Sequence, residues 1–173
     1  MATVAKLFDE RRIARRVEAL AAEIAKSLPR ELTLVVVLKG GFVFAADLMR
    51  ALDRAGLILR IDFMRLRSYG HAKESSGVVR SVGPMPDDLA GRDVLLVDDI
   101  VDTGRSLVAA RSLLLERGAA TISTCVLLDK PSRREVEAEP DFVGFTIDDV
   151  FVVGYGIDLA EQHRHLSYIG TID

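Results

Sequence analysis

The feature that most constrains the fold is a regular alternation of short apolar runs with longer amphipathic segments. Residues 33–38, 93–97 and 121–128 are rich in valine, leucine and isoleucine, which is typical of strands buried on both faces of a parallel sheet. The segments between such runs carry apolar residues at helical spacing. The alternation predicts one α/β domain over residues 1–173, with a mostly parallel, doubly wound sheet flanked by helices.

Proline and glycine set the expected ends of the helices. We expect a helix over residues 9–28 closed by Pro29, another over 42–55 ended by Gly56, and a third that follows residue 102 and ends at Arg117. Alternating apolar and polar side chains predict a strand over residues 57–66. Shorter strands are expected at residues 78–82 and 150–153, and a polar, glycine-rich, exposed loop at residues 67–76.

Composition excludes several classes of protein. The formal net charge of -3 argues against non-specific binding of nucleic acid, so any affinity for phosphate must be local. Cys125 is the only cysteine and lies in an apolar run, so we expect a buried thiol in a reducing compartment. The N-terminus is charged, and no apolar run approaches the ~20 residues of a membrane-spanning helix. We therefore expect a soluble, cytoplasmic protein without a membrane or nucleic-acid partner.

Three aspartates crowd the end of the strand at residues 93–97. Asp98, Asp99 and Asp102 repel one another unless cations or hydrogen-bond donors satisfy them. If Asp102 and Thr103 capped the next helix, that would account for only part of the cluster. The helix start also offers free backbone N–H groups, and Gly104 lets a phosphate approach them. A ribose 5-phosphate suits this combination, because its hydroxyls can donate to the carboxylates and its phosphate can accept from the N–H groups of the loop.

Two other phosphate-binding motifs can be excluded. A P-loop would have a glycine where Asp99 stands and a lysine where Arg105 stands. The segment Gly154-Tyr155-Gly156 lacks the third glycine of a dinucleotide-binding fingerprint and precedes no clear helix. Neither motif explains the acidic cluster.

The segment Val97–Ser106 resembles the phosphoribosyl pyrophosphate signature of type I phosphoribosyltransferases, and the wider chain resembles the hypoxanthine-guanine phosphoribosyltransferases. The resemblance runs in order from about Leu32 to Tyr168. Further segments that are similar to family motifs are Leu38–Phe42, Arg67–Gly70, Leu127–Lys130 with Arg133 and Arg134, Asp141–Phe145 and Phe151–Asp158. The resemblance implies the family's fold, with a small hood over the base site formed by residues from about 131 to 173 and the N-terminal segment, beside a core at about 30–130.

The same resemblance implies the donor site. Asp98 and Asp99 are expected to bind the ribose hydroxyls, directly or through Mg²⁺, although the family more often has glutamate at the position of Asp98. Asp102 is the expected general base or acid, and it also belongs to the donor-binding loop. The 5′-phosphate is expected on Thr103, Gly104, Arg105 and Ser106, with no role for the Arg105 side chain. Lys39 and Gly40 are expected to contact the pyrophosphate, after a cis peptide bond between Leu38 and Lys39.

On the purine side, the resemblance implies that Lys130 reads the purine O6. Phe151 is expected to stack on the base, and the backbone of Val152 to meet its Watson–Crick edge, although residues 150–153 would be core in many folds. Asp158 is the expected ligand of a metal that carries the pyrophosphate, with Arg164 as its counter-charge. Ser68 and Tyr69 are expected in a mobile loop that closes over the reaction centre. His163 and His165 are interpreted as surface residues.

The implied activity is transfer of phosphoribose from phosphoribosyl pyrophosphate to hypoxanthine or guanine, with Mg²⁺, in a homodimer or homotetramer. Two alternatives remain open. The base could instead be xanthine, since specificity depends on the geometry of the hood. The chain could also be a regulator that senses phosphoribosyl pyrophosphate and binds nucleic acid. A regulator needs a basic surface, for which the sequence offers only Arg11, Arg12, Arg15 and Arg16.

Overall fold

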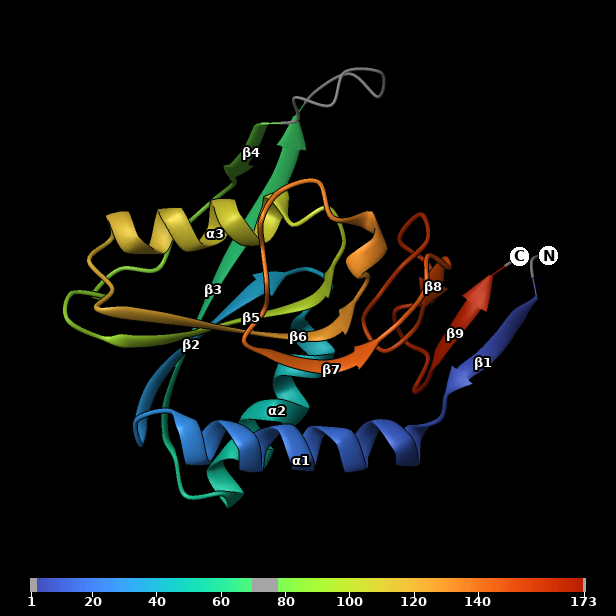
Figure 1. The fold of residues 1–173 in the computed structure, drawn as a ribbon, viewed down its shortest axis with the longest axis horizontal. Coiled ribbons are helices and arrows are strands. Elements are labelled where there is room, and N and C mark those ends of the chain that lie inside the picture. The colour runs from blue at the N-terminus through green and yellow to red at the C-terminus, as the bar shows by residue number, and fades with distance from the viewer. Residues whose placement is uncertain (1–2, 70–77, 173) are drawn as a thin grey trace.

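The computed structural model describes residues 3–69 and 78–172, and Figure 1 shows a central sheet with helices on both sides. The strands of this sheet are β2 (Glu31–Leu38), β3 (Ile58–Tyr69), β4 (Val78–Ser81), β5 (Asp93–Val101), β6 (Thr121–Asp129) and β7 (Phe142–Thr146). Their order is β4-β3-β2-β5-β6-β7. All neighbouring pairs are parallel except the antiparallel pair of β3 and β4 at one edge. The predicted α/β fold is confirmed.

Helices cover the two faces of the sheet unequally. Helices α1 (Glu10–Ser27) and α2 (Phe42–Arg54) lie on one face and α3 (Arg105–Glu116) on the other, as Figure 1 shows. All three helices were predicted. Asp9 caps α1 by accepting a hydrogen bond from the backbone N–H of Arg12 at 2.7 Å, and the predicted stripe of apolar residues on α1 is buried. One apolar cluster fills each side of the sheet.

A second, three-stranded sheet joins the two ends of the described chain. It consists of β1 (Val4–Phe8), β9 (Ile169–Ile172) and β8 (Val152–Val153), in the order β1-β9-β8. Both pairs are antiparallel. The strand expected at residues 150–153 is therefore shorter than predicted and belongs to this small sheet. Conversely, β7 belongs to the large sheet, although it lies in the segment expected to form the hood.

Strand β3 has an apolar face that the described residues cover only in part. The register with β2 sets Ile61 beside Leu34 and Phe63 beside Val36, on the face that α1 and α2 cover. Leu34 is fully buried, yet Ile61 remains 37% exposed and Phe63 47% exposed. The alternation of β3 was predicted, but Ile61 and Phe63 extend past the helices, whereas Leu59 on the same face packs against the core. Within the described residues, no helix is both long and apolar enough to cross a membrane.

Candidate active site

A cleft of about 280 Å³ opens where the carboxyl ends of β2 and β5 meet the start of α3. Ligands of open parallel sheets bind beyond this end of the strands. The cleft brings together residues that the sequence singled out from two separate segments. Those that line it are Gly40, Asp98, Asp99, Asp102, Thr103, Gly104 and Ser106.

Asp98 and Asp99 form the acidic wall of the cleft. They belong to β5 itself, because this strand continues to Val101 instead of ending at Val97 as predicted. Asp98 is buried and Asp99 is partly buried. Burial raises the pKa of both carboxyls, and the adjacent charge of Asp99 raises the pKa of Asp98 further. Paired carboxylates facing a polar cleft suit a hard cation such as Mg²⁺, which binds one or two carboxylates together with substrate phosphates and water.

We predict that Asp98→Asn raises the thermal stability of the ligand-free protein at neutral pH. The folded-state pKa of Asp98 lies above its unfolded value. The contribution of Asp98 to stability is therefore fully present below the unfolded value of about 3.9. That contribution is lost as the pH rises through the folded-state pKa. Melting temperatures from pH 4 to pH 8 should therefore diverge, with the variant higher at the alkaline end. Asp53→Asn, at an exposed site on α2, is the control, and parallel curves for wild type and Asp98→Asn would contradict the prediction.

The loop from Asp102 to Gly104 has the backbone geometry of an anion site. Gly104 precedes the first residue of α3 with a φ of 89°, and the N-terminus of the helix opens toward the cleft. A Cβ at this position would lie 2.7 Å from Cβ of Ala138, so only glycine fits. The capping interpretation of Asp102 is wrong, since its carboxylate instead accepts a hydrogen bond from Nε of Arg133 at 3.1 Å. Thr103 does contribute, because its Oγ1 accepts from the backbone N–H of Arg105 at 3.3 Å.

The segment after Lys130 supports this loop from behind. Arg134 donates through Nη1 to the backbone oxygen of Asp102 at 3.0 Å and through Nη2 to Oδ1 of Asp129 at 2.7 Å. The backbone N–H groups of Glu135 and Val136 both donate to the oxygen of Thr103. The Arg134–Asp129 pair is largely buried, at 12% and 7% side-chain exposure. The conformation of the loop is therefore fixed by contacts with residues that follow β6.

The loop after β2 approaches the acidic wall closely. The peptide bond between Leu38 and Lys39 is cis, as the resemblance implied. A Cβ on Gly40 would collide with the carboxylate of Asp99. Gly40 therefore allows the backbone of this loop to lie directly against the side chain of Asp99. This contact joins the two segments that the resemblance assigned to the pyrophosphate and the ribose.

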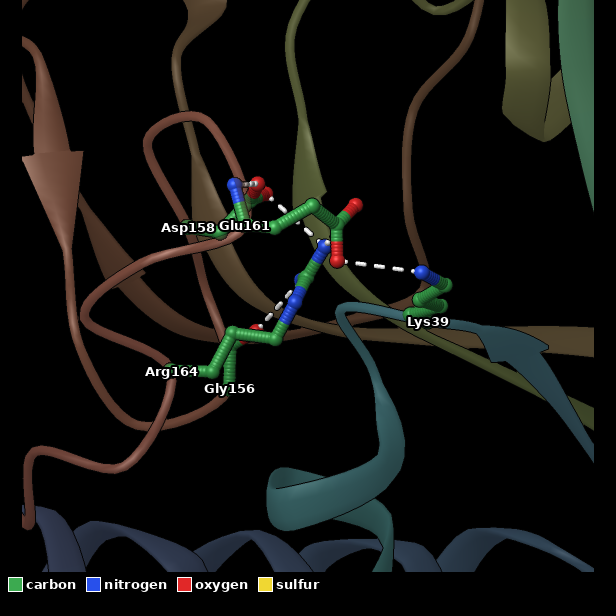
Figure 2. A network of polar contacts seen from close by, with 5 residues as sticks. All are labelled: Lys39, Gly156, Asp158, Glu161 and Arg164. Atoms are coloured by element: carbon green, nitrogen blue, oxygen red, sulfur yellow. Dashed lines mark hydrogen bonds and ion pairs between the residues drawn. The ribbon is translucent and has the colours of Figure 1, made fainter.

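A cluster of charged side chains lies beside that loop, as Figure 2 shows. Arg164 reaches Oδ1 of Asp158 at 3.1 Å, and it donates through Nη1 to the backbone oxygen of Gly156 at 2.8 Å. Glu161 lies between the two cations, with Oε2 at 3.0 Å from Nζ of Lys39 and Oε1 at 3.3 Å from Nη2 of Arg164. The expected pairing of Asp158 with Arg164 is present. Both carboxylate oxygens of Asp158 accept hydrogen-bond or ion-pair donors within the chain, since Oδ2 accepts the N–H of Glu161.

Two contacts connect the segment expected on the purine side to residues that line the cleft. Lys130 is buried, and its backbone N–H donates to the oxygen of Val101 at 3.0 Å. Arg133 joins Asp102 to Asp149, two residues before Phe151. Val152 is buried in the small sheet, whereas Phe151 is 52% exposed. The interpretation of Phe151 as a core residue is therefore wrong, and its ring is free to contact a ligand.

Comparison with known proteins gives the family. The phosphoribosyl transferase domain matches residues 3–160. The chain belongs to the phosphoribosyltransferase family. Several relatives and solved structures that are similar to this phosphoribosyltransferase have names that state a substrate. A hypoxanthine-guanine phosphoribosyltransferase of Aquifex aeolicus is 44% identical over 169 residues, which are 96% of this chain and 93% of the relative.

Two further comparisons agree with that relative. A hypoxanthine phosphoribosyltransferase of Salmonella typhimurium is 41% identical over 173 residues, covering 98% of this phosphoribosyltransferase and 96% of the relative. The crystal structure of a hypoxanthine-guanine phosphoribosyltransferase from Bacillus anthracis superposes with a TM-score of 0.91 at 37% identity. The superposition covers 97% of this chain and 98% of the Bacillus anthracis chain. The likeness therefore extends over nearly the whole phosphoribosyltransferase.

Some residues of the site could not be found by sequence reasoning alone. Glu161 lies near Lys39 only because a loop from the C-terminal part of this phosphoribosyltransferase meets the loop after β2. The supporting role of Arg134 had one sequence signal, the paired arginines after Pro131. Ser68 and Tyr69 belong to the end of β3 and pair with β4, so the exposed loop predicted over residues 67–76 is wrong for residues 67–69. Residues 70–76 of that loop lie outside the described part of the chain.

Proposed function

We propose that this chain transfers the 5-phosphoribosyl group of phosphoribosyl pyrophosphate to a 6-oxopurine, hypoxanthine and also guanine, and releases pyrophosphate. One observation supports the proposal above all: the carboxylates of β5 and the glycine-containing start of α3 line one cleft. A sugar and its phosphate can bind there together. The names of the relatives point to the same substrates.

In the proposed reaction, a ring nitrogen of the purine forms a bond to C1′ of the ribose as the bond from C1′ to pyrophosphate breaks. The base must lose a proton as the new bond forms, and Asp102 accepts it. Its carboxylate is 42% exposed and accepts from Arg133, so it is both accessible and oriented. A carboxylate in such a position contributes typically ~10²–10⁴-fold to the rate.

The donor is proposed to bind along the cleft from Lys39 to Ser106. Thr103 to Ser106 hold the 5′-phosphate through the N–H groups and hydroxyls at the start of α3. Asp98 and Asp99 hold the ribose hydroxyls, directly or through Mg²⁺, and Lys39, Gly40 and Arg164 hold the pyrophosphate. Mg²⁺, when bound by Asp98, Asp99 or Asp158, neutralises part of the charge on the leaving pyrophosphate.

The purine is proposed to lie between Phe151 and the buried Lys130. Lys130 donates to the purine O6, and the backbone of Val152 meets the Watson–Crick edge. The exposed ring of Phe151 provides a stacking surface. Ser68 and Tyr69, at the end of β3, are proposed to move with the loop that excludes water from the reaction.

The proposed environment is the cytoplasm. Cys125 is fully buried as a free thiol, and burial raises its pKa well above the ordinary value. Such a thiol is unreactive and requires no oxidising compartment. A role in nucleic-acid binding is not favoured, because two of the four arginines on α1 are engaged within the fold. Arg16 donates to backbone oxygens of Val143 and Gly144, and Arg12 lies over the rings of Phe8 and Phe145.

We further propose that the protein is a homodimer or homotetramer in which a second copy covers β3. Phe63→Asp should then weaken self-association by about tenfold or more, because a charge would be buried at the centre of an apolar contact. Light scattering after size-exclusion chromatography measures the effect. Leu115→Asp, at a comparably exposed position on the other face of the sheet, is the control. Equal masses for wild type and Phe63→Asp at every concentration would contradict this interface.

Initial rates with hypoxanthine, guanine, xanthine and adenine test the proposed function. Each base is tested with phosphoribosyl pyrophosphate, with and without Mg²⁺. We expect consumption of hypoxanthine and guanine only when the donor and the metal are both present. Preference for xanthine would change the assigned base but leave the assigned phosphoribosyl transfer intact. If no base were consumed, the proposal would be rejected.

A further inference from the structure

Glu161 lies between the two cations to which we assign pyrophosphate. Its two carboxylate oxygens are within 3.0 Å of Nζ of Lys39 and 3.3 Å of Nη2 of Arg164. Figure 2 shows this side chain extending from its loop into the space between them. The side chain is 64% exposed, so it can rotate into solvent without disturbing the core. A carboxylate of the chain thus occupies a place suited to an anionic ligand.

The local backbone gives no reason for a glutamate at this position. Leu159 and Gln162 exchange two backbone hydrogen bonds, of 3.1 Å and 3.0 Å, around a tight turn. Ala160 and Glu161, between them, have φ values of 49° and 64°. Turns with two central residues at positive φ favour glycine, asparagine and aspartate. Since glutamate is poorly suited to the turn, its side chain needs a different explanation.

We propose that Glu161 is a positioning residue that substitutes for pyrophosphate between Lys39 and Arg164 in the free protein and lowers the affinity for pyrophosphate. The inference rests on the proposed function, because it requires pyrophosphate to bind these two cations. In the free protein the carboxylate offsets the repulsion between them. When pyrophosphate binds, the like charges repel and Glu161 rotates outward. The same repulsion favours release of pyrophosphate as a product.

The other contacts of Arg164 make this idea testable by substitution. Arg164 also contacts Asp158 at 3.1 Å and the backbone oxygen of Gly156 at 2.8 Å, and neither contact involves the side chain of residue 161. Glu161→Gln therefore removes the competing charge while Arg164 stays in position. Glu161→Asn also removes it and suits the left-handed backbone better, so this variant folds at least as well as wild type.

The test is the dissociation constant of pyrophosphate in the presence of Mg²⁺, measured by calorimetry on the full-length protein. Both variants should bind pyrophosphate more tightly, by about threefold to tenfold at low ionic strength. The difference from wild type should shrink at high salt, because exposed charges are screened. Glu23→Gln is the matched control, since it removes an exposed acid (48% against 64% for Glu161) that pairs with Arg16 at 2.8 Å on α1.

A gain in affinity is a result that loss of a merely structural contact would not produce. If both variants bind pyrophosphate as wild type does, or more weakly, the inference is overturned. If Glu23→Gln tightens binding as much as Glu161→Gln, the effect belongs to net charge and the inference is also overturned. If wild type itself does not bind pyrophosphate, the proposed function fails, and the inference fails with it.

Discussion

Asp102→Asn is expected to lower kcat by about 10²–10⁴-fold while the affinity for phosphoribosyl pyrophosphate changes little. Asparagine has nearly the same size but cannot accept the proton that the purine must lose. The loop around residue 102 should keep its conformation, because Arg134 donates to the backbone oxygen of Asp102 and not to its side chain. Rates under saturating substrate, together with donor binding measured by calorimetry, separate the two effects.

Asp149→Asn is the control for this prediction. Asp149 also pairs with Arg133, at 3.6 Å, but it is not among the residues that line the cleft. If the arginine contact alone mattered, both variants would lose activity equally. We expect only Asp102→Asn to lose turnover. An Asp102→Asn enzyme that retains the wild-type rate would refute the role assigned to this carboxylate.

Gly104→Ala is expected to lower kcat/KM for phosphoribosyl pyrophosphate by about 10²-fold, since displacements near 1 Å in a reacting site have effects of this size. The new Cβ would lie 2.7 Å from Cβ of Ala138 and 3.0 Å from Cδ of Arg134, so the phosphate loop must shift. The left-handed φ of 89° adds a conformational cost of about 1–2 kcal/mol.

Gly56→Ala separates these two contributions. Gly56 has a similar φ of 94°, but apart from its two chain neighbours no described residue comes within 4 Å of the position its Cβ would take. Both variants should lose stability in thermal unfolding through the left-handed φ, Gly104→Ala should lose more because of its steric clash, and only Gly104→Ala should lose activity. Equal kinetic effects of the two substitutions would show that the loop does not bind the phosphate in the way proposed.

The regular elements could be predicted because each is encoded locally. The helix ends at Asp9 and Gly56 and the amphipathic spacing on α1 are signals that involve only residues near in sequence. The helices accordingly begin and end within a residue or two of the expected positions. The acidic end of β5 was also visible, since three aspartates beside a helix start are unusual. Its exact conformation was not. Pairing with β6 continues the strand to Val101, and only the tertiary partner determines that.

Contacts between distant segments were beyond the reach of local patterns. Glu161 meets Lys39 across 122 positions of sequence, and nothing in either segment specifies the other. The exposure of Phe63 has the same origin. Its alternation predicted a strand correctly, but the width of the covering helix pair determines whether that face is buried. Sequence patterns indicate which way a side chain points, and packing determines what it meets.

The pairing of β1 with β9 has a consequence for the order of folding. Strand β1 has one strand partner among the described residues, and that partner, β9, lies more than 160 positions away in sequence. Strand β8, which follows Phe151 directly, pairs with that same last strand. Pairs between segments so far apart in sequence form late, because the loop between them must first be closed. We therefore expect the small sheet, and with it the segment that follows Phe151, to become ordered after the large sheet.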